Sequence, residues 1–211
     1  MDNIDTILFD PPFENEQFYK DIYCPEKEQS ILVFSDYKHW GAAIKGAMDA
    51  GWTPLFEFIW NNIQSWYTQN RPLAQHKTCY VFSDLKKWNF DKAIINDDIK
   101  RRKSHSKNAA GRGEYDYVPL KNGKHLSTVF DFSNTLLHDE HGQGKPVKWI
   151  AAILNGLNSQ NVFDAFSGSG TGIIACEQTE KNCFAMEIEP KHCDQAIKRY
   201  EKFTGKKAKK L

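Results

Sequence analysis

Asp10 stands at the end of a short apolar segment and is followed at once by two prolines and an aromatic residue. Residues 4–9 are mostly apolar and predict a buried strand. Pro11 and Pro12 would end that strand abruptly and stiffen the loop that follows. The carboxylate of Asp10, the proline turn and the ring of Phe13 would then form a small slot, lined by hydrogen-bond acceptors and with one stacking face.

This slot suits the exocyclic amino group of a planar base. Such a nitrogen is a poor nucleophile because its lone pair is conjugated with the ring. The carboxylate of Asp10 and the backbone carbonyl of Pro11 can each accept one N–H and draw the nitrogen toward a tetrahedral geometry, while Phe13 stacks on the base. No strong general base is needed if the attacked methyl group is carried by a sulfonium. The alternative is that Asp10 merely caps a strand, which the two prolines and Phe13 disfavour.

A second candidate site lies in residues 161–172, which read as a strand, a glycine-rich turn and the start of a helix. In α/β folds this arrangement holds an anionic or nucleoside ligand, since glycines let backbone N–H groups approach it closely. Another apolar run, residues 183–186, ends in Glu187, nineteen residues after Gly168. An acid at this position is well placed to bind ribose hydroxyls.

The glycine pattern alone is weak evidence for a cofactor. It is G-x-G-x-G and not the dinucleotide fingerprint G-x-G-x-x-G, and no Gly-Lys-Ser/Thr follows, which disfavours a P-loop. An ordinary turn in a βα unit remains the alternative. A run of metal-type side chains at residues 138–141 (His-Asp-Glu-His) reads as a polar loop, so we predict no metal site.

The elements that must position these residues alternate between strands and helices, which indicates an α/β sheet. Further strands are predicted at residues 30–35, 55–60 and 78–82, the last two as antiparallel neighbours, and helices at residues 40–50, 146–157 and 190–203. The basic end, residues 206–211, is expected to be frayed.

The amino-acid composition limits the binding partners and the cellular compartment that we expect for this protein. The chain has 211 residues, a net charge of +1 and five scattered cysteines without a C-x-x-C pair, which argues against a disulfide framework or a zinc site. It has no signal sequence and no apolar run near ~18 residues, so we expect a soluble cytoplasmic protein.

Any nucleic-acid surface must therefore come from local clustering of charge. Residues 86–124 hold eleven Lys or Arg against five Asp or Glu, a net charge of +6, with four aromatic residues interleaved. The stretch is either a solvated insertion or a nucleic-acid contact region. The candidate contacts are Lys100, Arg101, Arg102, Lys103, Lys107 and Arg112.

Taken together, these motifs resemble those of the amino-methylating DNA methyltransferases, which modify adenine N6 or cytosine N4 with S-adenosylmethionine. Residues 10–13 match the catalytic motif of the family, and residues 164–171 match its cofactor motif. Glu187 matches the acid after the next strand, with Pro190 and Arg199 in the helix that follows. His141, Lys145 and Pro146 match an element that precedes the cofactor strand. Catalytic motif first and cofactor motif last is the order of the β group.

The resemblance implies roles for single residues. Asp164 and Thr171 would hold the methionine end of the cofactor, Lys145 and His141 would flank it, and Glu187 would bind the ribose. The predicted cofactor-binding set is His141, Lys145, Asp164, Phe166, Ser167, Gly168, Ser169, Gly170, Thr171 and Glu187. The predicted catalytic set is Asp10, Pro11, Pro12 and Phe13.

Three departures from the family pattern stand out. Ala165 replaces a proline, and glycines precede Lys145 where the family has Pro and Thr. Only three residues precede Ile4, where the family commonly has another strand and an acidic turn. We therefore expect the sheet to lack one strand, and no contacts to the cofactor adenine are assigned.

The resulting expectation is a Rossmann-like methyltransferase fold, with a mostly parallel sheet flanked by helices. Its parts are a catalytic part (1–83), a target-recognition insertion (84–137), a cofactor-binding part (138–205) and a basic tail (206–211). The small insertion suggests a short or relaxed target.

The expected activity is methyl transfer from S-adenosylmethionine to adenine N6 in DNA, by base flipping. Asp at the first catalytic position favours adenine, and cytosine N4 is the alternative. A non-catalytic DNA-binding module is a further alternative, and RNA or protein-amide methylation is disfavoured. A restriction-modification role and a homodimer are possible within this group.

Overall fold

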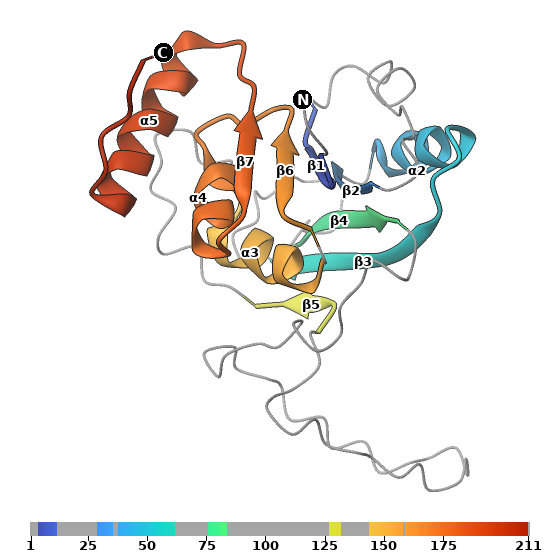
Figure 1. The fold of residues 1–211 in the computed structure, drawn as a ribbon. Helices are drawn as coiled ribbons and strands as arrows, with labels where there is room; N and C mark the ends of the chain where they lie inside the picture. The colour runs from blue at the N-terminus through green and yellow to red at the C-terminus, as the bar shows by residue number, and fades with distance from the viewer. Residues whose placement is uncertain are drawn as a thin grey trace, which may run out of the picture.

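The computed structural model describes residues 4–11, 29–35, 38–61, 76–83, 127–131, 144–157 and 159–210. These residues form a seven-stranded sheet with helices against it (Figure 1). The strands are β1 (Thr6–Phe9), β2 (Ser30–Ser35), β3 (Pro54–Asn61), β4 (His76–Phe82), β5 (Val129–Phe130), β6 (Asn161–Asp164) and β7 (Asn182–Ala185). The helices are α2 (Trp40–Asp49), α3 (Val147–Gly156), α4 (Thr171–Gln178) and α5 (Pro190–Thr204).

The sheet is mostly parallel, as predicted. Its strand order is β5-β3-β4-β2-β1-β6-β7. Among the described strands β4 alone runs antiparallel to its neighbours, β2 and β3. The predicted antiparallel pairing of the third and fourth strands is thus confirmed. Together with the flanking helices, this arrangement is a Rossmann-like α/β fold.

The two candidate motifs meet at the centre of the sheet. β1 pairs in parallel with β2 on one side and with β6 on the other, with Leu8 aligned to Asp164. The chain after β1 leads to β2, whereas the chain after β6 leads to β7 on the opposite side. The direction of winding therefore reverses between β1 and β6, and the crevice at the carboxyl ends of such strands is where open α/β sheets bind ligands.

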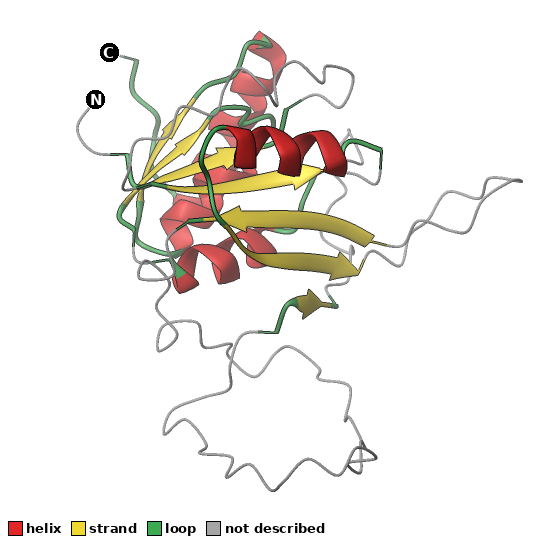
Figure 2. Ribbon diagram, turned by 90° about the vertical axis from the view of Figure 1, so that its right-hand side faces the viewer, coloured by secondary structure: helices red, strands yellow, loops and turns green. Residues whose placement is uncertain are grey.

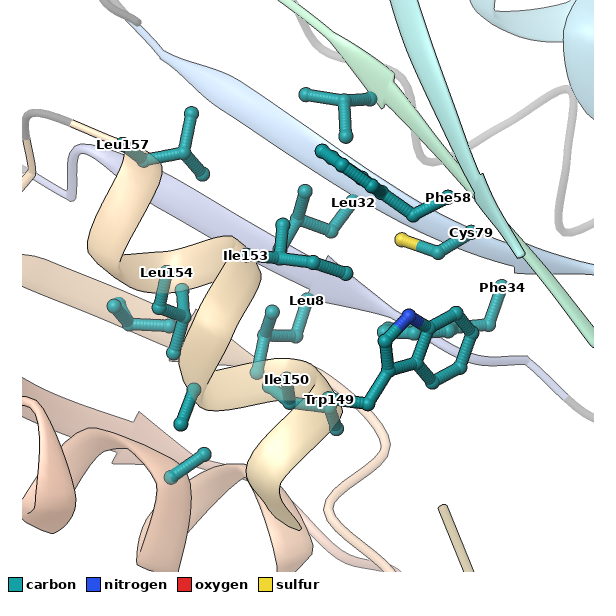
Figure 3. Close-up of a cluster of buried hydrophobic side chains, with 14 of the residues drawn as sticks. Leu8, Leu32, Phe34, Phe58, Cys79, Trp149, Ile150, Ile153, Leu154 and Leu157 are labelled. Carbon is teal, nitrogen blue, oxygen red and sulfur yellow. The ribbon is translucent and has the colours of Figure 1, made fainter. Parts of the chain in front are cut away.

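Helices cover both faces of the sheet, which gives three layers (Figure 2). Alternate residues of each central strand point to opposite faces. Leu8 and Leu32 belong to the core beneath α3, whereas Phe9 and Val33 pack with Ala43 and Ala47 of α2. Figure 3 shows Trp149, Ile153 and Leu154 of α3 directed toward the sheet.

Two parts of the chain differ from expectation. β5 lies within the stretch predicted as an insertion, yet it pairs in parallel with β3. A two-residue strand is too short to show a periodic pattern, so the sequence does not reveal it. The basic tail was expected to fray. In the structure, however, Lys207 and Ala208 N donate hydrogen bonds to the carboxylate of Glu201, and Lys206 donates one to Glu177.

At the other edge of the sheet, β7 pairs with β6 and with no other strand that the structure describes. The expectation that the sheet lacks one strand stays a prediction. At this edge Phe184 and Met186 are 47% and 59% exposed, and Ile188 just beyond the strand is 97% exposed.

Candidate active site

Asp10 lies immediately beyond β1 and presents its carboxylate at the carboxyl edge of the sheet. Its side chain is 32% exposed, whereas Pro11 is buried. Pro12 and Phe13 lie outside the described residues, as does His141.

Lys145 approaches the same carboxylate from the other half of the chain. It precedes Pro146, the N-cap of α3, whose extended backbone turns the chain into the helix. The ammonium of Lys145 donates a hydrogen bond to Oδ2 of Asp10 and forms an ion pair with it. Its Nζ also lies 4.8 Å from the centroid of the Phe34 ring, and the side chain is 14% exposed. The predicted cofactor residue Lys145 thus contacts the predicted catalytic residue Asp10.

The glycine-rich turn between β6 and α4 is held by backbone hydrogen bonds. Ser167 N donates to Met186 O at 3.0 Å, and Gly170 N donates to Ser167 O at 2.8 Å. Gly168 and Gly170 have φ values of +50° and +82°, which L side chains rarely adopt. These positions therefore require the glycines that the sequence motif supplies.

Glu187 braces the turn from the end of β7. Its Oε2 accepts a hydrogen bond from Gly168 N at 2.7 Å, and its Oε1 accepts one from Glu189 N at 2.9 Å. His192 Nδ1 lies 3.9 Å from Glu187 Oε1. A carboxylate that is fixed beside a glycine turn is well placed to accept hydrogen bonds from vicinal hydroxyls.

Arg199 supports the turn from α5. Its Nη1 donates to Ser169 Oγ and Thr171 Oγ1, each at 3.0 Å. The sequence motif placed Arg199 in the helix after Glu187 but gave it no function. The structure shows that it ties α5 to the turn and to the start of α4.

Close packing brings the start of α4 against Asp164. A Cβ on Gly172 would lie 2.1 Å from Asp164 Oδ2 and 2.9 Å from Leu8 Cδ1. Only glycine lets the helix start this close to the carboxylate. Asp164 itself is 5% exposed, and its Oδ1 accepts a hydrogen bond from Phe166 N at 3.3 Å.

Burial raises the pKa of the Asp164 carboxyl to about 7. The Phe166 N–H and the positive charge of Lys145 act against this rise, whereas the negative charges of Asp10 and Glu187 add to it. The group therefore titrates near neutral pH, and a cationic partner would favour its ionised form.

One cavity of about 340 Å³ joins the two motifs. Its lining includes the predicted residues Asp10, Lys145, Asp164, Phe166, Ser167, Gly168, Ser169 and Thr171. Sequence reasoning did not assign the other lining residues, Leu8, Phe34, Gly144, Ile150, Gly172 and His192. Gly172 belongs to the glycine turn, but the others read only as strand, helix or loop positions, and nothing in their local pattern signals a site.

The cavity has the features that an amino-acid nucleoside needs. Gly168 and Gly172 line the cavity without filling it with side chains. The predicted residues Gly170 and Glu187 are not among the lining residues, although Glu187 accepts a hydrogen bond from Gly168 N, which is part of the wall. Carboxylates and an ammonium on its walls match a zwitterionic amino-acid group. The residues present therefore fit a ligand such as S-adenosylmethionine.

Several predicted features lie outside the described residues. They are the candidate DNA contacts Lys100, Arg101, Arg102, Lys103, Lys107 and Arg112, and the polar run at residues 138–141. Within the described part of the chain, no group of three His, Cys, Asp or Glu residues is arranged to hold a metal ion. None of the described helices is both long and apolar enough to cross a membrane.

Comparison with known proteins places these features in a family. The model of a DNA methylase family, N6_N4_Mtase, matches residues 24–198. The match begins after the candidate catalytic segment, so Asp10 lies outside it. A Type II methyltransferase of Serratia marcescens, M.SmaI, is 23% identical over 151 residues. That alignment covers 71% of this chain and 47% of M.SmaI, so the chain spans about half the length of that relative.

Solved structures share the fold. A complex of M1.HpyAVI with SAM superposes with a TM-score of 0.66 at 20% identity, covering 93% of this chain and 88% of that one. The PvuII DNA methyltransferase, which is cytosine-N4-specific, superposes with a TM-score of 0.67 at 15% identity, covering 96% and 83% of the two chains. The arrangement of the sheet and helices is therefore that of known methyltransferases.

Proposed function

Since this chain belongs to the N6_N4_Mtase family of DNA methylases, we propose that it transfers a methyl group from S-adenosylmethionine to the N6 amino group of adenine in DNA. The observation that supports this most strongly is the shared cavity. It places Asp10, the candidate acceptor for the base, beside Asp164 and the glycine turn, the candidate cofactor site.

In this proposal, residues in and beside the cavity each bind a different part of the cofactor. Asp164 holds the methionine ammonium, Lys145 faces its carboxylate, and Glu187 accepts hydrogen bonds from the ribose. Ile188, 97% exposed and next to Glu187, offers an apolar surface beside the ribose position. When bound, S-adenosylmethionine supplies an electrophilic methyl group on a sulfonium.

Asp10 and Pro11 activate the target nitrogen. The base leaves the duplex to reach the carboxyl edge of β1, at the cost of its stacking and pairing. The Asp10 carboxylate and the Pro11 carbonyl accept its two N–H bonds, which localises the nitrogen lone pair, and Phe13 stacks on the ring. No strong general base is required, because the nitrogen becomes acidic only once it carries the methyl group.

Adenine is preferred over cytosine because an aspartate occupies the first catalytic position. The direct test is to incubate the protein with unmethylated DNA and labelled S-adenosylmethionine, digest the DNA and analyse the nucleosides. Label in N6-methyladenine is the expected result. Label in N4-methylcytosine would keep the mechanism and refute the choice of base, and equal labelling of single-stranded RNA would refute the choice of DNA.

The substitution Asp10→Ala distinguishes an enzyme from a non-catalytic DNA-binding module. For an enzyme this change should abolish methylation and leave cofactor binding measurable. If wild type binds S-adenosylmethionine but labels no DNA, the binding module or a missing partner subunit becomes the better account.

The same proposal assigns the remaining parts of the chain. Residues 84–137 would form the target-recognition region, which follows β4 and precedes the segment that carries Lys145.

A homodimer would cover exposed apolar side chains such as Phe184 and Ile197, which are 47% and 46% exposed. Light scattering on the purified protein tests the dimer directly. The free thiols of Cys79, Cys176, Cys183 and Cys193 fit a reducing cytoplasm.

A further inference from the structure

Lys145 is the one Lys or Arg among the described residues that line the cavity, which also has two aspartates in its wall. Its ion pair is formed with Asp10 and not with Asp164. With 14% of its side chain exposed, Lys145 is largely withdrawn from solvent, so its charge is only partly screened by water.

Two carboxylates would compete for the ammonium of Lys145: that of Asp10 and that of a bound amino-acid ligand. A zwitterionic amino-acid group can pair its own ammonium with Asp164, but its carboxylate needs a cation. Arg199 does not line the cavity and already donates hydrogen bonds to Ser169 and Thr171, and His192 Nδ1 lies 3.9 Å from Glu187 Oε1. Among the described lining residues, Lys145 is therefore the strongest candidate for the ligand carboxylate.

Asp10, in contrast, must be released from the ammonium of Lys145 before it can bind the base. Its carboxylate must accept an N–H from the incoming base, yet Oδ2 already accepts a hydrogen bond from Lys145. An ion pair that persisted through the reaction would compete with the base and would withdraw charge from the acceptor.

We propose that Lys145 is a positioning residue that exchanges partners: it holds Asp10 before ligand binding and moves to the carboxylate of the bound cofactor, which frees Asp10 for the base. This inference rests on the proposed function. By linkage, the pairing with Asp10 must weaken cofactor binding by the same factor as cofactor binding weakens that pairing.

A double-mutant cycle on ligand affinity tests the exchange without relying on activity. The probe is S-adenosylhomocysteine, measured by calorimetry, because it keeps the amino-acid carboxylate but lacks the sulfonium that Asp10 could attract. Asp10→Asn should tighten its binding by about 5-fold, since Lys145 is released, and Lys145→Met should weaken it by about 10-fold. In the Lys145→Met background, Asp10→Asn should change the affinity by less than about 2-fold.

Lys148→Met is the matched control, because Lys148 is an exposed lysine three residues away on α3. It should leave the affinity unchanged. If Asp10→Asn tightens binding equally with and without Lys145, simple repulsion between Asp10 and the ligand explains the effect and the exchange is refuted. If Asp10→Asn does not tighten binding at all, Lys145 serves only to place Asp10, and the exchange is again refuted.

The experiment also separates this inference from the proposed function. Wild-type protein that binds no S-adenosylhomocysteine would refute the proposed cofactor site itself. Wild-type protein that binds it, with additive effects of the two substitutions, would refute the exchange alone. Thermal unfolding of each variant confirms that any loss of binding does not arise from loss of the fold.

Discussion

Asp10 and Asp164 line the same cavity but have different surroundings. Asp10 is partly exposed and paired with Lys145, whereas Asp164 is 5% exposed and has a pKa raised to about 7 by burial. Between pH of about 4 and 7 the folded protein therefore retains a proton on Asp164 that the unfolded chain has released. Stability contributed by this group is present at low pH and is lost as the pH rises through about 7.

Cofactor binding should show the complementary pH dependence. The ammonium of S-adenosylhomocysteine favours the ionised form of Asp164, so its dissociation constant should fall as the pH rises from 5.5 toward about 7 and then level off. Calorimetry across this range measures the effect. The Asp164→Asn variant should bind S-adenosylhomocysteine more weakly, with an affinity that no longer depends on pH. The His192→Gln variant should keep the pH dependence. A wild-type affinity that is constant with pH would contradict this role of Asp164.

At the scale of elements, the turn between β6 and α4 works because three other elements support it. Glu187, just after β7, accepts a hydrogen bond from Gly168 N. Arg199 of α5 donates hydrogen bonds to Ser169 and Thr171, and Leu8 of β1 lies against Gly172. The backbone that faces the ligand is thus fixed before binding, which reduces the entropy lost when the complex forms.

Gly170→Ala should disrupt this arrangement. Its φ of +82° disfavours any L side chain, and the added Cβ would lie 2.9 Å from the Cβ of Ala196 in α5. We expect a loss of about 1–3 kcal/mol in the free energy of unfolding, measured by urea denaturation. Gly41→Ala in α2 is the control, because no atom lies within 4 Å of its added Cβ.

The control should be neutral or slightly stabilising, by up to about 1 kcal/mol, because alanine has the higher helix propensity. Equal stability of the Gly170 and Gly41 variants would show that the turn adapts to a side chain without cost.

At the scale of the whole molecule, α3 joins the two halves of the chain. It begins two residues after Lys145, and its buried face packs against strands from the N-terminal stretch, such as β1 and β2, and against β6 (Figure 3). Because Lys145 is attached to this helix, the packing of α3 also determines where the ammonium meets Asp10.

Ile153→Ala should destabilise the fold substantially. Ile153 is 0% exposed in the centre of α3, so removing its side chain leaves a cavity and should cost about 2–5 kcal/mol in the free energy of unfolding. The matched control is Ile188→Ala, whose side chain is 97% exposed and should change stability by less than about 0.5 kcal/mol. Chemical denaturation of both variants checks the difference, and a mild effect at Ile153 would show that neighbouring side chains move in to fill the space.

DNA affinity should depend on where charge lies, because the whole chain carries a net charge of only +1. Substitution of Lys100, Arg101, Arg102 and Lys103 by Gln should weaken DNA binding. It should also reduce the slope of log K against log salt by about 0.9 for each DNA phosphate that is no longer neutralised. The control replaces Lys206, Lys207, Lys209 and Lys210 by Gln, an equal change of charge at the tail. Equal weakening by both sets would argue against a dedicated DNA-binding region at residues 100–103.

Much of this molecule follows from the sequence because its signals are local. Apolar runs bounded by turn residues located β1, β2, β6 and β7, and the periodicity of apolar residues located α2, α3 and α5. The glycines at 168 and 170 were identified because their positive φ values constrain residue type. The structure places Glu187 beside this turn, and its role in binding hydroxyls stays a prediction.

The tertiary structure alone decided the rest, because these features depend on contacts between residues far apart in the chain. The short β5 pairs with β3, and Lys206 and Lys207 of the tail pair with Glu177 and Glu201. Neither feature has a local signature in the sequence. The pKa of Asp164 is raised by burial, which no neighbouring residue in sequence reveals. The ion pair of Lys145 with Asp10 joins residues 135 positions apart, and only the pairing of β1 beside β6 brings them together.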